Sequence, residues 1–278
     1  MATFFGEVQS VYSRAIEEYD EDLDGNDEDE QIRQEVQEKR EVHLSWYSED
    51  SQALGGRFLQ CSDFILAVGH NAASFLSAYF VKTENWKAIG HATLWNERTS
   101  TRVGQTSEQP TGVFYRHVED PSVLMCKITD YIAEDQLFQW TEKVFGCLQP
   151  RGLNVIVLSD SLAADYMTSD YLRDSMGLFL RCLQTSVSKR KIICPLLEQP
   201  NIVSGLPAAV LSHCQVHHIP AVAYQCYSDV IRPDSTTMEA YKPVLTILNK
   251  IIKLDVGPNA DVLSKFAKTS DVQSNLYI

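Results

Sequence analysis

Short apolar runs along the chain predict β-strands of two kinds. The runs "LNVIVLS" (153–159) and "IPAVAYQCY" (219–227) are almost continuously apolar, which is the pattern of strands buried on both faces. Apolar and polar residues alternate in "EVHLSWY" (41–47), which predicts a strand buried on one face. Two further runs, "GVFYRHV" (112–118) and "SVLMCKI" (122–128), are separated by acidic residues and a proline, so they predict two antiparallel strands.

An amphipathic helix is predicted over residues 133–146. Its apolar residues recur at spacings of three and four, which places them on one face: Leu137, Trp140, Val144 and Phe145. Gly146 suits the C-terminal end of this helix. Upstream, residues 63–81 are typical of an apolar strand, a turn at Gly69 and a helix in succession.

Three more helices are predicted in the C-terminal part of the chain. Residues 206–217 form a helix with Pro207 in its first turn, a position where proline is well tolerated. Residues 235–254 have apolar side chains in helical register, but Pro243 should kink or split that helix. A last short helix is expected over 259–268.

Strands that alternate with helices predict an α/β layered sandwich, in which helices flank a mixed central sheet. We expect a single α/β domain over residues 38–268, preceded by an acidic, largely disordered segment (1–37) and followed by a flexible tail (269–278). Two polar stretches, 97–111 and 160–170, predict mobile loops.

Negative charge is concentrated near the N-terminus. The net charge is −13, and residues 17–30 hold ten acidic residues and no basic one, so the remaining chain carries only −3. Such a block repels itself and does not fold alone, although residues 27–40 at its end predict a short helix. A nucleic-acid or anionic-membrane surface requires a basic cluster. The sequence has none, so we expect neither nucleic-acid binding nor membrane insertion.

The cysteines favour a reducing environment. There are seven, an odd number, scattered through apolar stretches without paired spacing. The sequence contains no N-x-[ST] sequon, no signal peptide and no apolar run approaching the ~20 residues of a membrane span. We therefore expect a soluble intracellular protein with reduced thiols.

The turn "AVGHNAAS" around Gly69 joins a strand to a helix, and α/β folds often bind phosphate at such a helix N-terminus. It contains one glycine and lacks the G-x-G-x-x-G and G-x-x-x-x-G-K-[ST] patterns that bring backbone close to phosphate. A plain turn between strand and helix is therefore favoured.

His213 and His217 are four residues apart in "HCQVHH", the spacing of a zinc-binding pair on one helix face. No glutamate follows His213 as in H-E-x-x-H, and no C-x-x-C supplies further ligands. We expect ordinary surface or boundary histidines here and no metal site.

A nucleophilic site is not marked in the sequence either. Seven cysteines and seven histidines allow a Cys–His pair in principle, but nothing local indicates an activated thiol. The serine-hydrolase motif G-x-S-x-G is absent. We therefore expect no catalytic residue and no cofactor.

The chain ends on three large residues, Leu276, Tyr277 and Ile278, behind the polar stretch 269–275. One interpretation is that the tail folds back onto its own domain, since most apolar residues serve intrachain packing. The seven-residue, mostly polar stretch before the tripeptide resembles a tether, which favours a partner-binding end instead. The residues by themselves leave both interpretations open.

Several stretches together resemble the proteasome assembly chaperone 1 family. They are "MATFFGEV" at the start, "AEDQLFQWTEKVFG" in the middle, "CPLLEQPNIV" with "LPAAVLSHCQV" later, and "QSNLYI" at the end. The resemblance implies a non-enzymatic α/β chaperone that forms a heterodimer with proteasome assembly chaperone 2. Such a pair recruits proteasome α-subunits, supports formation of the seven-membered α-ring, prevents off-pathway ring association, and leaves as the core particle matures.

The resemblance also implies a role for the final tripeptide and a location. Proteasome-binding proteins commonly end in a hydrophobic–Tyr–any motif that enters pockets between neighbouring α-subunits. That motif falls on Leu276, Tyr277 and Ile278, the last bearing the carboxylate. The implied location is the cytoplasm, with an association with the endoplasmic reticulum. The alternative of a different class is a small-molecule phosphorylase-like or hydrolase-like α/β enzyme that uses the Gly69 turn.

Overall fold

A computed structural model describes residues 27–47, 58–80, 85–96, 110–168, 177–229 and 235–252. The chain divides into two compact units, residues 1–40 and 41–278. In the first unit, the predicted short helix is present as α2 (Asp27–Lys39). The acidic residues before it, the predicted helix over 259–268 and the tail all lie outside the described residues. The described part of the second unit, residues 41–252, is called the α/β body below.

The α/β body is built on one eight-stranded sheet with the order β1-β3-β4-β5-β2-β6-β8-β7. β2 pairs in parallel with both β5 and β6, and β6 pairs in parallel with β8; the remaining pairs are antiparallel. The predicted mixed sheet is therefore confirmed. The strands are β1 (His43–Trp46), β2 (Asp63–Val68), β3 (Trp86–Thr93), β4 (Gly112–His117), β5 (Val123–Ile128), β6 (Asn154–Leu162), β7 (Phe179–Gln184) and β8 (Ala221–Ser228).

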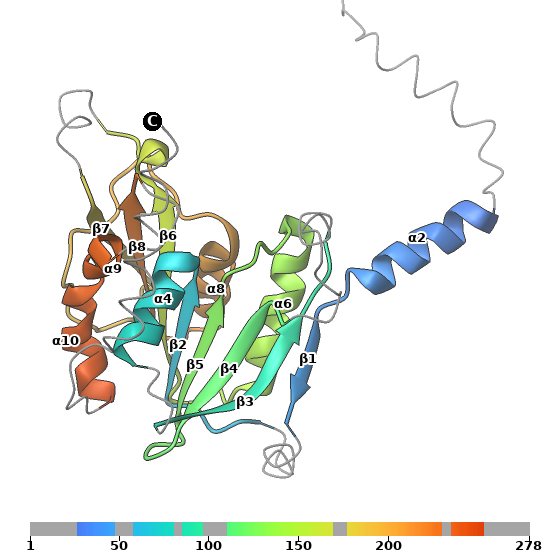
Figure 1. The fold of residues 1–278 in the computed structure, drawn as a ribbon, viewed down its shortest axis with the longest axis horizontal. Coiled ribbons are helices and arrows are strands. Elements are labelled where there is room, and N and C mark those ends of the chain that lie inside the picture. Colours follow the sequence, from blue (N-terminus) through green and yellow to red (C-terminus); the bar gives the residue numbers. More distant parts are fainter. Residues whose placement is uncertain are drawn as a thin grey trace, which may run out of the picture. The chain divides into compact units, whose positions relative to one another are not determined.

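Helices cover both faces of this sheet, which makes the predicted layered sandwich (Figure 1). α6 (Glu134–Cys147) and α8 (Gly205–Val216) pack into one core, and α4 (His70–Tyr79) packs with α9 (Ser235–Glu239) and α10 (Lys242–Ile251) into the other. A short 3-10 helix, η2 (Ala163–Asp165), follows β6. The division between α9 and α10 confirms the split predicted at Pro243, which lies in the first turn of α10.

The central strands supply alternate residues to the two cores. In β2, Phe64 and Leu66 face one core while Ile65 and Ala67 face the other. Successive side chains of a strand point to opposite faces, so a strand covered on both sides needs apolar residues throughout. This explains the continuous apolar runs at β6 and β8, and all eight residues of β8 are buried.

The loop predicted over 160–170 is wrong for residues 160–165, whereas residues 166–168 have no regular secondary structure. Residues 160–162 continue β6 and pair with the end of β8, and η2 follows. Tyr166 is buried, and its ring lies 4.9 Å from the rings of both Phe179 and Tyr227 (centroid to centroid). Arg181 extends this cluster, with its guanidinium 4.9 Å from the Phe179 ring centre. Aromatic side chains from β7 and β8 thus pack against Tyr166 just after η2. In the loop predicted over 97–111, residues 97–109 lie outside the described ranges.

Two strands were not predicted from the sequence. β3 carries Lys87, Gly90 and His91 among its apolar residues, and β7 carries a buried arginine, Arg181. Both therefore lack a clean period of two. Their strand character follows from pairing with neighbours, β3 with β1 and β4, and β7 with β8. Within the described residues, no helix has the length and apolar character needed to cross a membrane.

Candidate functional site

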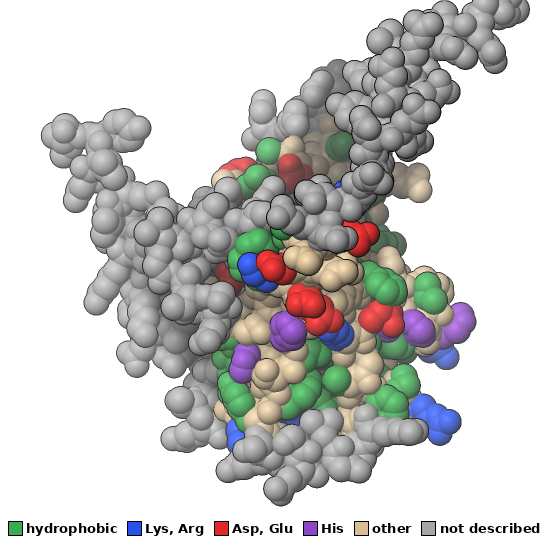
Figure 2. All heavy atoms as spheres, turned by 90° about the vertical axis from the view of Figure 1, so that its right-hand side faces the viewer, with side chains coloured by type: hydrophobic (Ala, Val, Ile, Leu, Met, Phe, Trp, Pro, Cys, Tyr) green, Lys and Arg blue, Asp and Glu red, His purple; other side chains and the backbone are tan. Residues whose placement is uncertain are grey.

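The predicted partner-binding residues, Leu276, Tyr277 and Ile278, lie outside the described residues. Two other places singled out by the sequence, the Gly69 turn and the pair His213 and His217, lie within them. On the face of the molecule in Figure 2, the coloured Lys and Arg side chains are scattered rather than gathered in one basic patch.

The Gly69 turn is occupied by a carboxylate from the chain itself. Asp160, near the end of β6, accepts a hydrogen bond from the Asn71 N–H to Oδ2 (2.7 Å) and from the Ala72 N–H to Oδ1 (3.2 Å). The Tyr241 hydroxyl lies 2.8 Å from Asp160 Oδ1 and 2.6 Å from the Ser159 carbonyl oxygen, and both are within reach as acceptors of its proton. The carboxylate therefore takes the place that a bound phosphate would take at the start of α4.

Glycine is required at this turn for two reasons. Gly69 has φ 104°, a conformation that residues with side chains rarely adopt. A Cβ at this position would also lie 2.3 Å from Asp160 Oδ2. The glycine thus allows the carboxylate to approach the helix N-terminus, where the helix dipole favours negative charge.

The electrostatics of the turn follow from desolvation and hydrogen bonding. Desolvation raises the pKa of the Asp160 carboxyl, while the hydrogen bonds from Tyr241 and the two backbone amides oppose that shift. Burial and the neighbouring carboxylate raise the pKa of Tyr241 well above its usual value. A phosphate could bind at this turn only by displacing Asp160. The turn therefore stabilises the fold, as favoured from the sequence.

The two histidines lie at a groove between α6 and α8. The groove has a volume of about 370 Å³, and its apolar wall includes Leu137, Phe138 and Val216. The Phe138 and Val216 side chains are 75% and 72% exposed, so the wall presents neighbouring apolar side chains to solvent. The polar end of the groove is formed by Glu142, His213 and His217.

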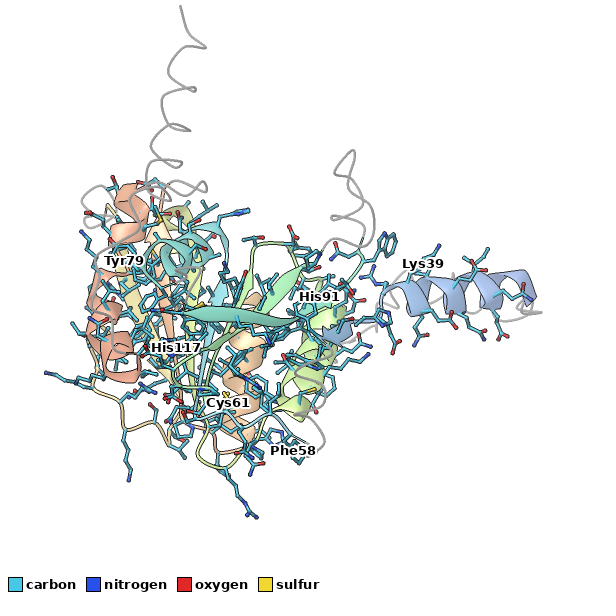
Figure 3. All side chains as sticks on the ribbon, turned by 60° about the horizontal axis from the view of Figure 1, so that its bottom comes forward. Lys39, Phe58, Cys61, Tyr79, His91 and His117 are labelled. Carbon is cyan, nitrogen blue, oxygen red and sulfur yellow. The ribbon has the colours of Figure 1, made fainter. Side chains whose placement is uncertain are left out.

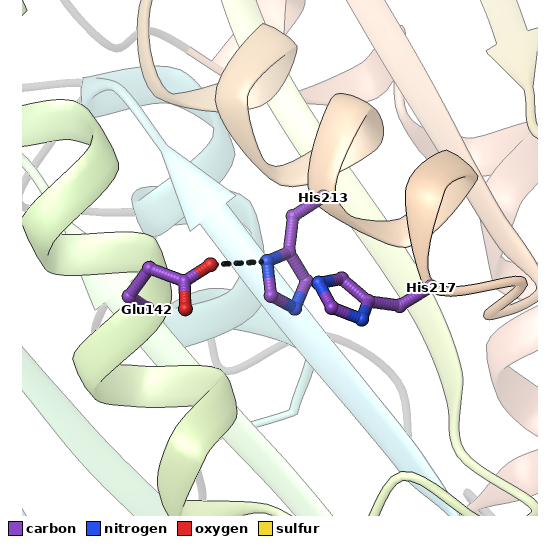
Figure 4. Close-up of side chains that lie close together, drawn as sticks. All are labelled: Glu142, His213 and His217. Carbon is purple, nitrogen blue, oxygen red and sulfur yellow. Dashed lines mark hydrogen bonds and ion pairs between the residues drawn. The ribbon is translucent and has the colours of Figure 1, made fainter.

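In the structure, a third side chain that could coordinate a metal ion lies beside the two histidines, although it is distant from them in the sequence. Glu142 comes from α6, and its Oε1 lies 3.0 Å from His213 Nδ1 (Figure 4). The His213 and His217 ring centroids are 4.2 Å apart. One ligand atom from each of the three residues lies within 4.8 Å of the other two. These side chains could hold a metal ion, and sequence reasoning missed Glu142 because it is 71 residues away from His213.

His213 is the most restrained member of this cluster. Its side chain is 12% exposed, compared with 47% for Glu142, and its ring centroid lies 4.6 Å from that of Phe145. Burial and the neighbouring His217 lower the pKa of His213, against the opposing effect of Glu142. The neutral imidazole, which is the form that binds metals, is therefore favoured.

The thiols show little sign of nucleophilic activation. Burial raises the pKa of Cys61, Cys214 and Cys226 to about 12 each. Figure 3 shows Cys61 among the packed side chains of the α/β body. Cys182 differs: a hydrogen bond with the Cys194 thiol lowers its pKa, and the same interaction raises the pKa of Cys194. Cys182 itself is buried, which limits its access to a substrate.

Comparison with known proteins gives matches over the whole chain. A family model described as Proteasome assembly chaperone 4 matches residues 1–278. A protein from Danio rerio named Proteasome assembly chaperone 1 is 51% identical over 285 residues, covering 100% of both chains. The protein of the same name from Homo sapiens is 41% identical over 287 residues, covering 99% of each chain.

Solved structures share the fold at low sequence identity. Pyrococcus furiosus PbaB, described as an archaeal proteasome activator, has a TM-score of 0.56 and 10% identity, covering 86% of this chain and 100% of its own. Pyrococcus furiosus PbaA, described as an archaeal homolog of proteasome-assembly chaperone, has a TM-score of 0.52 and 14% identity, covering 84% of this chain and 90% of its own.

Proposed function

The chain belongs to the proteasome assembly chaperone 1 family, and from this premise we propose that it is a non-enzymatic chaperone for assembly of the proteasome core particle. The observation that carries the proposal is the full-length likeness to relatives of that name, at 51% identity in Danio rerio and 41% in Homo sapiens. The Asp160 carboxylate in the Gly69 turn also weighs against the alternative of a phosphate-using enzyme. We place the protein in the cytoplasm, with an association with the endoplasmic reticulum.

In the proposed mechanism the protein acts as a heterodimer with proteasome assembly chaperone 2. The heterodimer recruits α-subunits, supports formation of the α-ring and prevents off-pathway ring association. Leu276 and Tyr277 bind in a pocket between neighbouring α-subunits, and the carboxylate of Ile278 pairs with a pocket lysine. Tyrosine suits such a pocket because it combines an apolar ring with a hydroxyl that reaches the rim.

The energetics of the tail explain why it needs the rest of the protein. Burying Leu276 and the Tyr277 ring contributes roughly 3–6 kcal/mol, and a charge-assisted bond from the Ile278 carboxylate about 1.5–3 kcal/mol. Fixing four flexible residues costs on the order of 4–8 kcal/mol, and association itself costs more. The tail alone should bind weakly. The docked α/β body holds it near its pocket at a high effective concentration.

The tail is tested by a pull-down of α-subunit intermediates with the co-expressed heterodimer. We expect Tyr277→Ala to reduce recovery of α-subunits. Adding one glycine after Ile278 should be nearly as damaging as deleting residues 276–278, because it moves the carboxylate by about 3.5 Å. The peptide "DVQSNLYI" alone should show barely measurable affinity. Full recovery of α-subunits by the glycine-extended form would contradict carboxylate capture.

The heterodimer is tested by expression with and without the sister chaperone. We expect the chain alone to self-associate or to be poorly soluble, and co-expression to give a single species of one copy of each chain. Sedimentation of the purified samples measures both outcomes. A stable, monodisperse monomer of the chain alone would contradict an obligate partner.

A further inference from the structure

The backbones that carry Glu142, His213 and His217 are held in fixed relation. α6 and α8 lie on the same face of the sheet, and Trp140, Val144 and Phe145 of α6 share a core with Val210 and Cys214 of α8. All five of these core side chains are at most 6% exposed. This shared core fixes α6 relative to α8. The backbone positions of Glu142, His213 and His217 are therefore set by the fold.

The end of α8 is built so that His217 stays in helical register with His213. The His217 N–H donates to the His213 carbonyl oxygen (3.0 Å), and the Ile219 N–H donates to the Cys214 carbonyl oxygen (2.8 Å). His218 adopts a positive φ of 54°. This is the Schellman arrangement that ends many helices. Because the last turn is closed in this way, both imidazoles project from the same side of α8, as Figure 4 shows.

The His213 ring is oriented before any ligand binds. Phe145 packs against it on one side, with 4.6 Å between ring centroids, and Glu142 fixes its Nδ1 by a contact of 3.0 Å. Glu142 and His217 are the exposed members of the group, so both can rotate toward a common point.

The donor set and its spacing fit one kind of ion. Two imidazoles and one carboxylate are the ligands of many three-residue zinc sites, whereas Ca²⁺ and Mg²⁺ prefer sites made of oxygen atoms. Zn–N distances of about 2.0–2.1 Å in a tetrahedron place ligand atoms roughly 3.3 Å apart. The 3.0 Å contact between Glu142 and His213 is close to that spacing, and the full set lies within 4.8 Å.

We propose that Glu142, His213 and His217 bind one Zn²⁺ ion, which joins α6 to α8 at the polar end of the groove. Three protein ligands leave a fourth position, which water fills from the open side of the groove. The apolar wall formed by Leu137, Phe138 and Val216 borders the ion and limits the approach of further polar ligands. The site does not depend on the proposed assembly role, and its failure would leave that role intact.

Binding is tested by titrating ZnCl₂ into the full-length protein, alone or with its co-expressed partner chain, after treatment with EDTA and removal of the chelator. Isothermal titration calorimetry should give one Zn²⁺ per copy of this chain. Glu142→Gln and His217→Gln should each weaken binding at least about 100-fold, since the loss of an outer-shell partner already costs about 10–100-fold. Both substituted residues are exposed, so the variants should fold normally.

Matched controls separate this site from nonspecific binding. Glu134 lines the same groove outside the cluster, and His218 directly follows His217, so Glu134→Gln and His218→Gly should bind Zn²⁺ like the wild type. Cys194→Ser should also leave binding unchanged. Co²⁺ should show the intense visible absorption of a four-coordinate ion in the wild type and lose it in His217→Gln.

A stability measurement gives an independent readout. At a Zn²⁺ concentration roughly 100 times Kd, the thermal midpoint should rise by about 5–10 °C in the wild type. It should not rise in Glu142→Gln. The proposal is overturned if Zn²⁺ binding survives both cluster variants, if it is lost in Cys194→Ser, or if the wild type binds no Zn²⁺ at micromolar concentration.

Discussion

The Gly69 turn and the groove between α6 and α8 both bring together groups of a kind that bind ligands. They differ in one respect: a side chain of the protein occupies the turn, whereas the groove is open. At the turn, Asp160 reaches backbone amides 89 positions earlier in the chain and occupies them. At the groove, Glu142 joins His213 across 71 positions, and the three polar groups border open space. In the first arrangement the Asn71 and Ala72 backbone amides are already paired with the Asp160 carboxylate, whereas in the second the side chains keep the capacity to coordinate a ligand. Changes at the turn should therefore alter folding, and changes at the groove should alter binding.

The largest effect is expected from Gly69→Ala. A methyl group here combines an unfavourable φ of 104° with a contact of 2.3 Å to Asp160 Oδ2, so the carboxylate must move away from the helix. Unfolding in urea should show a loss of about 2–6 kcal/mol. Gly146→Ala is the matched control, because Gly146 lies within α6 with no heavy atom near its added Cβ. That control should be neutral or stabilised by up to about 1 kcal/mol, and an equal loss in both variants would contradict the account of the turn.

Asp160→Ala should have the next largest effect. It removes the acceptor of the Asn71 and Ala72 amides and a partner of the Tyr241 hydroxyl, which should cost about 2–4 kcal/mol in the free energy of unfolding. Asp160→Asn keeps one acceptor oxygen and should lose less. If the carboxylate fills an anion site, sulfate should stabilise Asp160→Ala more than it stabilises the wild type. Equal stabilisation of the two by sulfate would show that the vacated turn does not bind anions.

His218→Gly should be mildly stabilising. His218 is exposed and has a φ of 54°, a conformation that favours glycine at the end of a helix. We expect a gain of roughly 0.5–1 kcal/mol in the free energy of unfolding, measured in urea. A loss of stability would mean that the His218 side chain makes contacts that its exposure does not reveal.

The smallest effect on folding is expected within the groove. Phe138 is 75% exposed, so Phe138→Ser should change the free energy of unfolding by no more than about 0.5 kcal/mol. Phe145 on the same helix is 6% exposed, and Phe145→Ala should cost about 3–5 kcal/mol. Thermal or urea unfolding of the two variants side by side tests the contrast. A large loss in Phe138→Ser would show that the groove wall contributes to folding.

Much of the fold could be predicted from the sequence because the relevant signals are local. The apolar runs at β2, β6 and β8 indicated strands covered on both faces, and both cores take alternate residues from them. The spacing of Leu137, Trp140 and Val144 predicted α6, and Pro243 predicted the division between α9 and α10. Periodicity is a property of neighbouring residues, so it survives without knowledge of the tertiary contacts. The family likeness is also a property of the sequence alone.

The tertiary structure decided which distant residues meet. The irregular segments of β3 and β7 are strands because they pair with neighbouring strands. Tyr166 is buried against the rings of Phe179 and Tyr227. Asp160 and Glu142 carry no local mark of their partners, since each acts on groups at least 71 positions away. Sheet order and helix packing bring such residues together, and those depend on the whole chain. The sequence by itself therefore determined most of the elements and the family. The fold determined that Asp160 occupies the Gly69 turn and that the groove between α6 and α8 stays open.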